Sequence, residues 1–250
     1  MAEVFSAQNL WKRFGNVAAV QGVSLNVHSG EVVGLLGPNG AGKTTTLRML
    51  AGILTPTDGQ VLIKGMDMRK HALEAKERIG FLSGDTQVYQ RLSPREVLLY
   101  FGRLYRMEET RLAQRIEQLV QELEMGAFAS RLCRTLSSGE KQRANIARAF
   151  VHEPDVLILD EPTSSLDVIS GQFIVEAIRR ERAAGRAIVL STHIMSEAEY
   201  LCDRIYLVHK GQIVGSGTLA GILAHSGCAN LTDAFLHYVE HGKQPAASGV

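Results

Sequence analysis

The sequence has few cysteines, and this excludes two classes of small cross-linked protein. Among 250 residues the only cysteines are Cys133, Cys202 and Cys228, and no two of them have the CxxC spacing. An odd number without that spacing indicates neither a disulfide framework nor a cysteine-rich zinc site. We therefore expect reduced thiols in a cytosolic protein.

Long hydrophobic runs are also absent. The longest aliphatic runs, such as residues 156–159 and 187–190, have the length of a strand and do not approach the roughly 18 residues that a membrane-spanning helix needs. Residues 1–14, MAEVFSAQNLWKRF, have scattered charges and lack the apolar segment of a secretory signal. The chain is predicted not to span a membrane itself, so any membrane role requires a partner.

The sequence has no excess of charge of either sign. Its 27 Lys and Arg residues balance 26 Asp and Glu residues, which gives a formal charge of +1. No global field attracts nucleic acid, and we expect no nucleic-acid partner. With 45% hydrophobic residues, the composition is that of a packed, enzyme-like globular protein.

The hydrophobic pattern predicts an α/β protein that begins with antiparallel strands. Apolar and polar residues alternate over residues 23–27, as in a half-buried strand. Residues 31–36 are almost continuously apolar and precede a glycine-rich turn and a helix at 44–51, which is typical of a buried parallel strand. Helices and strands alternate from residue 139 onward, so we expect a parallel sheet covered by helices. The later strands are expected at 156–159 and 187–191, and two short strands flank residues 210–211. Helices are expected at 172–182 and 232–241, and Ser196 to Glu199 is expected to cap another.

A helical insertion at about residues 92–132 interrupts this pattern. Residues 93–96, Ser-Pro-Arg-Glu, are a capping box that predicts a helix to about Met107. A second helix, at 108–125, carries apolar residues at three- and four-residue spacing on one face. These residues are Leu112, Ile116, Leu119, Val120 and Leu123.

Residues 37–44, GPNGAGKT, match the phosphate-loop pattern GxxxxGK(S/T) between a buried strand and a helix. Glycines at positions 37, 40 and 42 let the backbone aim its N–H groups at phosphates, and the helix N-terminus adds positive potential. Lys43 is expected to reach the β- and γ-phosphates, and the Thr44 hydroxyl to bind Mg²⁺. The predicted nucleotide-binding residues are Gly37, Pro38, Asn39, Gly40, Ala41, Gly42, Lys43, Thr44 and Thr45.

Two carboxylates follow the buried strand at 156–159. In a parallel sheet this strand and the phosphate loop present their carboxyl ends to the same crevice. Asp160 is then expected to hold Mg²⁺, and Glu161 to act as the general base that polarises the attacking water. Taken alone, a DE pair at a strand end is as readily a solvated turn, and the upstream phosphate loop decides between the two readings.

A second anion-binding helix N-terminus is predicted at residues 136–143, LSSGEKQR. One nucleotide does not need two such sites. LSSGE before KQR, then LILDEPTSSLD, then STH at 191–193 resemble the ATP-binding subunit of ABC transporters, over residues 3–217. The resemblance implies a P-loop NTPase core with a parallel sheet, an antiparallel β subdomain and a helical subdomain, followed by a short helical tail at 218–250.

The resemblance also implies a head-to-tail pair, either a homodimer or a heterodimer with a similar subunit, with two ATP sites at one interface. Ser137 and Gly139 would touch the γ-phosphate of the neighbour's ATP, and Asp167 matches the loop that joins the two sites. His193 matches a switch histidine that contacts the γ-phosphate. The pair would sit peripherally on the inner face of the cell membrane, bound to integral membrane subunits.

An aromatic side chain is expected to stack on adenine. Phe14 matches the family position, and Trp11 is a rival for that role. The alternative for Phe14 is a half-buried residue of the sheet.

The sequence departs from the family pattern at three positions. Gly84 stands where the family usually has a Gln that ligates Mg²⁺ and relays the nucleotide state, and Asp85 or Gln87 are candidate substitutes. Ser138 replaces a Gly of the turn, and Glu140 replaces its Gln. A carboxylate near phosphates is unfavourable unless it is paired, and Lys141 or Arg143 are candidate partners.

The leading hypothesis is an ATPase subunit that powers transport, with the apolar face of the helical insertion and the Gly84 loop receiving a helix of the membrane subunit. Residues 78–107 and the segment DAFLHYVEHG resemble exporters, in particular of the sodium-extrusion type. One alternative is a soluble ABC-type mechanical ATPase acting on ribosomes or DNA. Another is a small-molecule kinase or GTPase, which leaves LSSGE and STH unexplained.

Overall fold

The computed structural model describes residues 2–84, 89–164 and 166–241. Across these ranges, no helix has both the length and the apolar character needed to cross a membrane. Asp85 and Gln87, the candidate substitutes for the missing Gln, lie outside the described residues, as do residues 242–250 of the tail.

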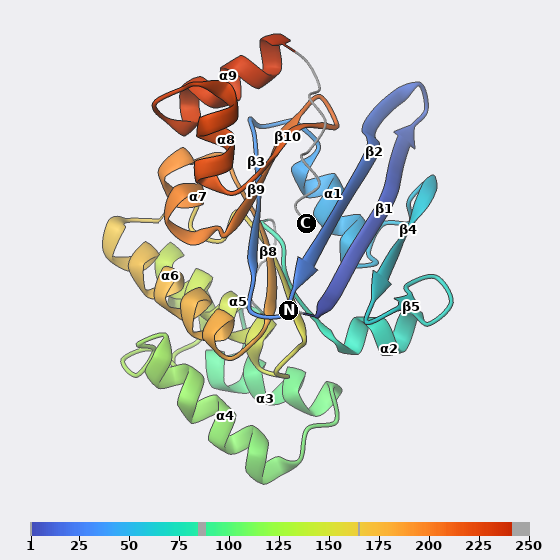
Figure 1. Ribbon diagram of the computed structural model, residues 1–250. Helices are drawn as coiled ribbons and strands as arrows, with labels where there is room; N and C mark the ends of the chain where they lie inside the picture. The colour runs from blue at the N-terminus through green and yellow to red at the C-terminus, as the bar shows by residue number, and fades with distance from the viewer. Residues whose placement is uncertain (1, 85–88, 165, 242–250) are drawn as a thin grey trace.

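Two sheets form the centre of the molecule (Figure 1). A six-stranded sheet has the order β10-β9-β3-β8-β7-β6, in which β6, β7, β8, β3 and β9 are parallel and β10 is antiparallel to β9. A four-stranded antiparallel sheet has the order β2-β1-β4-β5 and lies to one side of it. This arrangement confirms the expected α/β fold. The strands are β1 Glu3–Phe14, β2 Val17–His28, β3 Val32–Leu36, β4 Asp58–Ile63, β5 Met66–Asp67, β6 Ile79–Leu82, β7 Val156–Asp160, β8 Ala187–Thr192, β9 Arg204–His209 and β10 Gln212–Gly217.

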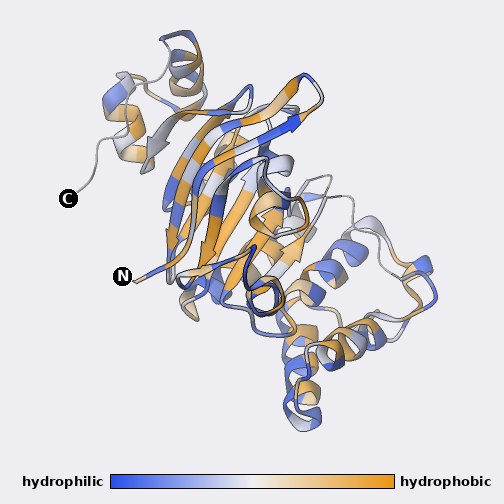
Figure 2. Cartoon of the chain, turned by 90° about the vertical axis from the view of Figure 1, so that its right-hand side faces the viewer, coloured by the Kyte–Doolittle hydropathy of each residue, from blue (hydrophilic) through white to orange (hydrophobic). Residues whose placement is uncertain are grey.

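The six-stranded sheet is buried on both faces, which explains its nearly continuous apolar strands. Along β7, Leu157 and Leu159 face the helices, whereas Val156 and Ile158 face the antiparallel sheet. Figure 2 shows the hydrophobic residues concentrated along these strands. The carboxyl ends of β3, β7 and β8 are thereby held side by side.

The helices of the described part of the chain cover these sheets. The predicted capping box at Ser93 is present, but the helix ends at Leu104 rather than Met107, because Tyr105 caps it and Arg106 has φ +56°. The expected start at residue 172 was wrong, since Asp167 caps a helix that begins at Val168. The cap expected at Ser196 was wrong, since that helix begins at Met195 and its N-cap is Ile194. The helices are α1 Lys43–Leu50, α2 Ala72–Glu77, α3 Pro94–Leu104, α4 Glu109–Glu122, α5 Ser138–Phe150, α6 Val168–Ala183, α7 Met195–Leu201, α8 Leu219–Ser226 and α9 Leu231–His241, with a 3-10 turn at Cys133–Thr135.

The apolar face of α4 is not free to receive a partner. Leu112, Leu119 and Leu123 are fully buried, and Ile116 and Val120 nearly so, in a core that this helix shares with α3, α5 and α6. The sequence identified the face correctly, but its occupant is the chain itself. A docking surface has to be sought elsewhere on the insertion.

The C-terminal helices α8 and α9 also pack on the protein. Ile222, Leu231 and Phe235 are buried against β9, β10 and α7. The described part of the tail is therefore a small extension of the sheet's edge, visible at the top of Figure 1.

Candidate nucleotide site

The phosphate loop joins β3, whose five residues are all buried, to α1. Two of its positions require glycine. A Cβ on Gly37 would lie 2.1 Å from the carbonyl oxygen of Val208, and Gly42 has φ +101° with the Ala19 carbonyl oxygen 2.6 Å from its Cβ position. Close contacts with the carbonyls of Val208 and Ala19, which are distant in sequence, therefore fix the path of the loop.

The hairpin between β9 and β10 supports the same loop. The Gly211 N–H donates to the carbonyl of Ala41, and the Gln21 N–H donates to the carbonyl of Gly211, each at 2.8 Å. Sequence analysis missed this support, because Gly211 lies about 170 residues beyond the loop and carries no motif of its own.

Lys43 lies at the start of α1 with its side chain turned over the loop. Its ammonium donates to the carbonyls of Gly37 at 2.6 Å and Pro38 at 3.1 Å, and lies 3.7 Å from Oε1 of Glu161. Burial lowers the pKa of Lys43, and the charges of Glu161 and Asp160 oppose this shift. The ammonium is held where loop carbonyls and two carboxylates converge.

Thr44 and Asp160 meet between α1 and the end of β7. The Thr44 hydroxyl donates to Oδ1 of Asp160 at 3.2 Å, and the Ser191 hydroxyl donates to the same oxygen at 2.6 Å. Hard oxygen donors of this kind suit Mg²⁺, which takes one or two protein ligands together with substrate phosphates. The described residues contain no group of three or more His, Cys, Asp or Glu side chains that could hold a metal ion.

Glu161 has a left-handed backbone, with φ +47°, which is unusual for a glutamate. Its N–H donates to the carbonyl of Ser191 at 3.2 Å and to the hydroxyl of Ser191 at 3.0 Å. Its carboxylate lies 3.1 Å from Nδ1 of His193. Ser191 therefore holds Asp160 and Glu161 together, a role that sequence analysis missed although Ser191 is the first residue of the STH segment.

These groups open into a cleft of about 370 Å³ beside the phosphate loop. Its walls come from the start of β2, the loop itself, Glu161 and the β9–β10 hairpin. The lining residues are Val17, Ala18, Ala19, Gln21, Asn39, Gly40, Gly42, Lys43, Thr44, Thr45, Glu161, Lys210 and Gly211.

The turn at Ser137–Gly139 belongs to a different surface. Ser137 caps α5, and a Cβ on Gly139 would lie 2.6 Å from the hydroxyl of Ser170 on α6. Asp167, which caps α6, accepts a hydrogen bond from the Ser170 N–H at 2.9 Å. The structure thus brings Ser137, Gly139 and Asp167 together, and none of them is among the described residues that line the cleft.

Comparison with known proteins agrees with this geometry. The family model "ABC transporter" matches residues 20–164. The chain is 39% identical over 227 residues to the ABC transporter ATP-binding protein NatA of Bacillus subtilis, which covers 90% of this chain and 92% of that protein. The chain belongs to the ABC transporter family. Its match to the Nod factor export ATP-binding protein I of Burkholderia lata is 39% over 210 residues, or 84% and 69% of the two chains.

A solved ABC cassette shares the fold. The dimeric post-hydrolysis cassette MJ0796, bound to ADP and phosphate, superposes with a TM-score of 0.77 and 27% identity over 86% of this chain and 98% of that one. These relatives confirm the expected family, the P-loop fold and the ATPase activity: the chain is an ATP-binding, ATP-hydrolysing subunit of an ABC transporter.

The ABC signature turn of this chain carries Glu140, whose direct ion pair is not with either expected partner, although the charge of Arg143 also lowers the pKa of Glu140. The ion pair is with Arg131, at 3.2 Å, and the described residues place neither Lys141 nor Arg143 within ion-pair distance of Glu140. The Arg143 guanidinium donates to the carbonyls of Leu123 and Glu124 instead. Arg131 was not predicted as the partner because a 3-10 turn separates it from the signature turn in the sequence.

Gly84, which stands where the resemblance led us to expect Gln, is exposed and follows β6. A Cβ at this position would lie 3.7 Å from the carbonyl oxygen of Asp160, an ordinary contact. The backbone therefore has room for a side chain at position 84, so crowding does not explain why this residue is a glycine.

Phe14 is better placed than Trp11 for contact with a base. Phe14 pairs with Val17, which lines the cleft, and its side chain is 52% exposed at the hairpin tip. Trp11 Nε1 lies 3.6 Å from the position that a Cβ on Gly22 would take, and it donates to Oδ1 of Asn9.

Proposed function

We propose that this ABC subunit pairs head to tail with a second copy or a similar subunit, closes around two Mg-ATP and drives export through separate integral membrane subunits. The observation that carries the proposal is the separation of two anion-binding helix N-termini on one chain. The loop at residues 37–45 lines the cleft, while the Ser137–Gly139 turn lies at another surface beside Asp167. A head-to-tail pair gives each turn a nucleotide to bind.

In this proposal residues 37–45 bind the phosphates, and Phe14 stacks on adenine. Lys43 neutralises charge on the β- and γ-phosphates. Thr44 and Asp160 hold Mg²⁺, which supplies a Lewis acid for the transferring phosphoryl group. The division of the chain into an ATPase domain at residues 3–217, with a helical subdomain at 92–132, and a tail at 218–250 is part of the same proposal.

Glu161 is proposed as the general base. It accepts a proton from the water that attacks the γ-phosphorus, and ADP leaves as the bond to the γ-phosphoryl group breaks. Ser191 binds the backbone of Glu161, and the carboxylate lies 3.7 Å from the Lys43 ammonium and 3.1 Å from Nδ1 of His193. The hydroxyl of Ser137 accepts from the Glu140 N–H, so its hydrogen is free to bind the partner's γ-phosphate, together with Gly139 and Asp167.

The membrane subunit is proposed to dock beside β6, where apolar side chains are exposed. A cleft of about 220 Å³ is lined there by Phe81, Phe101 and Tyr105, and Leu104 next to it is 61% exposed. His152 stacks on Tyr105 at 3.7 Å, and burial lowers the pKa of His152 to about 4, which keeps it neutral. Phe81 lies on β6, which leads to Gly84 beside the backbone of Asp160, so β6 connects this surface to a proposed Mg²⁺ ligand.

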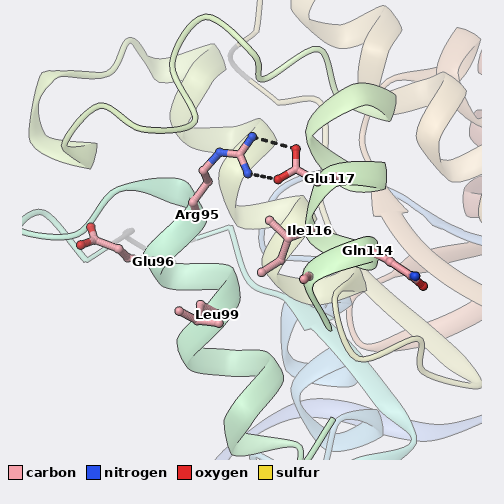
Figure 3. A pocket seen from close by; sticks show the side chains of 7 residues that line it. Arg95, Glu96, Leu99, Gln114, Ile116 and Glu117 are labelled. Carbon is pink, nitrogen blue, oxygen red and sulfur yellow. Dashed lines mark hydrogen bonds and ion pairs between the residues drawn. The ribbon is translucent and has the colours of Figure 1, made fainter. Parts of the chain in front are cut away.

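Another cleft, of about 430 Å³, lies between α3 and α4 (Figure 3). Leu99 and Ile116 line it, and the Arg95–Glu117 ion pair crosses its rim. All of its lining residues come from these two helices, so it has no direct path to Asp160, and the β6 surface is the better docking site.

Export and the inner face of the membrane are the finer parts of the proposal. The similarity to a protein named as a Nod factor export ATP-binding protein supports export. Attachment to membrane subunits would place the chain peripherally on the side of the membrane where ATP is made.

Affinity purification of the full chain from solubilised membranes of its native cell tests the transport role. We expect an integral membrane protein to co-purify in stoichiometric amount, and Leu104→Asp to reduce its recovery at least about tenfold, because a charge at the centre of an apolar contact must be desolvated. The matched control is Leu236→Asp, at a side chain that is 53% exposed on α9. Recovery of ribosomes or nucleic acid without a membrane protein would contradict the proposal.

A further inference from the structure

We propose that Arg131 is a positioning residue of the ATP site, which makes the Ser137–Glu140 turn electrically neutral toward the phosphates of the partner's ATP. This inference rests on the proposed function, since it requires the turn to face a nucleotide bound by the other subunit. Arg131 belongs to none of the ATP-binding motifs identified in the sequence.

Arg131 and Glu140 are joined by a directed set of hydrogen bonds. One guanidinium nitrogen of Arg131 donates to Oε1 of Glu140 at 3.2 Å, and the other donates to the carbonyl of Thr135 at 2.9 Å. Oε2 of Glu140 accepts from the Ser137 N–H at 2.7 Å. Glu140 therefore ties the first residue of the turn to Arg131, and Arg131 ties the carboxylate to the segment before the turn.

Glu140 carries its charge at neutral pH. Burial alone would raise the pKa of Glu140, but the hydrogen bonds from Ser137 and the charges of Arg131 and Arg143 outweigh burial and lower it. A carboxylate three residues after Ser137 weakens the attraction of this helix N-terminus for phosphate. An uncompensated unit charge within several ångströms of a polyphosphate changes affinity by roughly tenfold or more.

Arg131 is the cation in direct ion-pair contact with Glu140, whereas Arg143 acts on it through its charge without an ion pair. Arg143 is held between the rings of Phe128 and Phe173, at 4.8 and 5.2 Å, and donates to two carbonyls after α4. Arg131 is 49% exposed, so its ion pair contributes little to folding stability. A role in nucleotide binding and a role in stability therefore predict different results.

The test measures ATP-dependent dimerisation of the full chain in a Glu161→Gln background, by analytical ultracentrifugation over a range of Mg-ATP concentrations. We expect Arg131→Met to raise the ATP concentration for half-maximal dimer about tenfold. Adding Glu140→Gln should restore it to within about threefold, since glutamine accepts the same Ser137 N–H without a charge. The matched control, Arg95→Met, removes an exposed ion pair with Glu117 and should change nothing.

Two readouts separate this role from a structural one. ATP binding to monomers, followed with a fluorescent ATP analogue, should stay unchanged in Arg131→Met, because the residue acts on the partner's site. Arg131→Lys should retain most of the dimerisation, because it keeps the charge, and this variant also covers the case in which the methionine variant folds poorly.

The inference is overturned if Arg131→Met dimerises like its parent, if Glu140→Gln fails to rescue it, or if Arg131→Lys is as impaired as Arg131→Met. Failure of the proposed function looks different. In that case the Glu161→Gln parent itself stays monomeric with ATP, and this inference falls with it.

Discussion

Glu161→Gln is expected to reduce ATP turnover at least about 100-fold while ATP binding persists, because the amide accepts no proton from water but fills the same volume. The variant should accumulate as an ATP-bound dimer, since hydrolysis is the step that separates the pair. Loss of the negative charge also removes the like-charge neighbour of Asp160. Steady-state phosphate release and size-exclusion chromatography with light scattering measure the two effects.

Glu199→Gln is the matched control, because Glu199 is an exposed carboxylate on α7. It should keep the parent's turnover and show no ATP-trapped dimer. Near-normal hydrolysis by Glu161→Gln would remove Glu161 from the role of general base, whatever the dimer does.

Lys43→Met should weaken ATP binding by roughly 10- to 100-fold, the effect of losing charge-assisted hydrogen bonds to phosphate. The Lys43 side chain is 5% exposed and its ammonium is held by two loop carbonyls, so its position is already fixed. Methionine keeps the volume and removes the charge. Isothermal titration calorimetry with Mg-ATP measures the change.

An exposed lysine elsewhere provides the comparison for this variant. Lys70→Met removes a charge between β5 and α2 and should leave the ATP affinity unchanged. Equal affinity of Lys43→Met and the parent chain would place the phosphates somewhere other than in the loop.

The motifs could be predicted from the sequence because each is local. GPNGAGKT, DE at the end of an apolar strand and LSSGE before a helix report their own secondary structure within a few residues. The parallel sheet followed from the same local pattern, since residues 156–159 are all apolar and are buried on both faces of the sheet.

Features that depend on distant segments could not be predicted in this way. Ser191 holds Asp160 and Glu161 from a neighbouring strand, and Gly211 supports Ala41 from the far end of the chain. The pairing of Glu140 with Arg131 depends on the path of the segment between α4 and α5. A single sequence states which side chains are charged but not which of them meet.

Burial of amphipathic faces was the other source of error. The apolar spacing on α4 predicted a face that needs a partner, but it did not tell whether that partner belongs to the same chain. The start of α6 was misplaced because Val168 and Ile169 are poor helix formers, whereas the Asp167 cap outweighs their low propensity.

Disulfide cross-linking tests most directly whether the signature turn acts on the neighbouring subunit. Asn39 in the phosphate loop and Ser138 in the turn are both exposed, and a double Asn39→Cys/Ser138→Cys variant in the Glu161→Gln background places one thiol on each surface. With Mg-ATP and a mild oxidant, we predict a covalent dimer, whereas either single variant and the chain with its native cysteines alone should give none. An internal disulfide within a monomer, formed with ATP and without covalent dimer, would contradict the account.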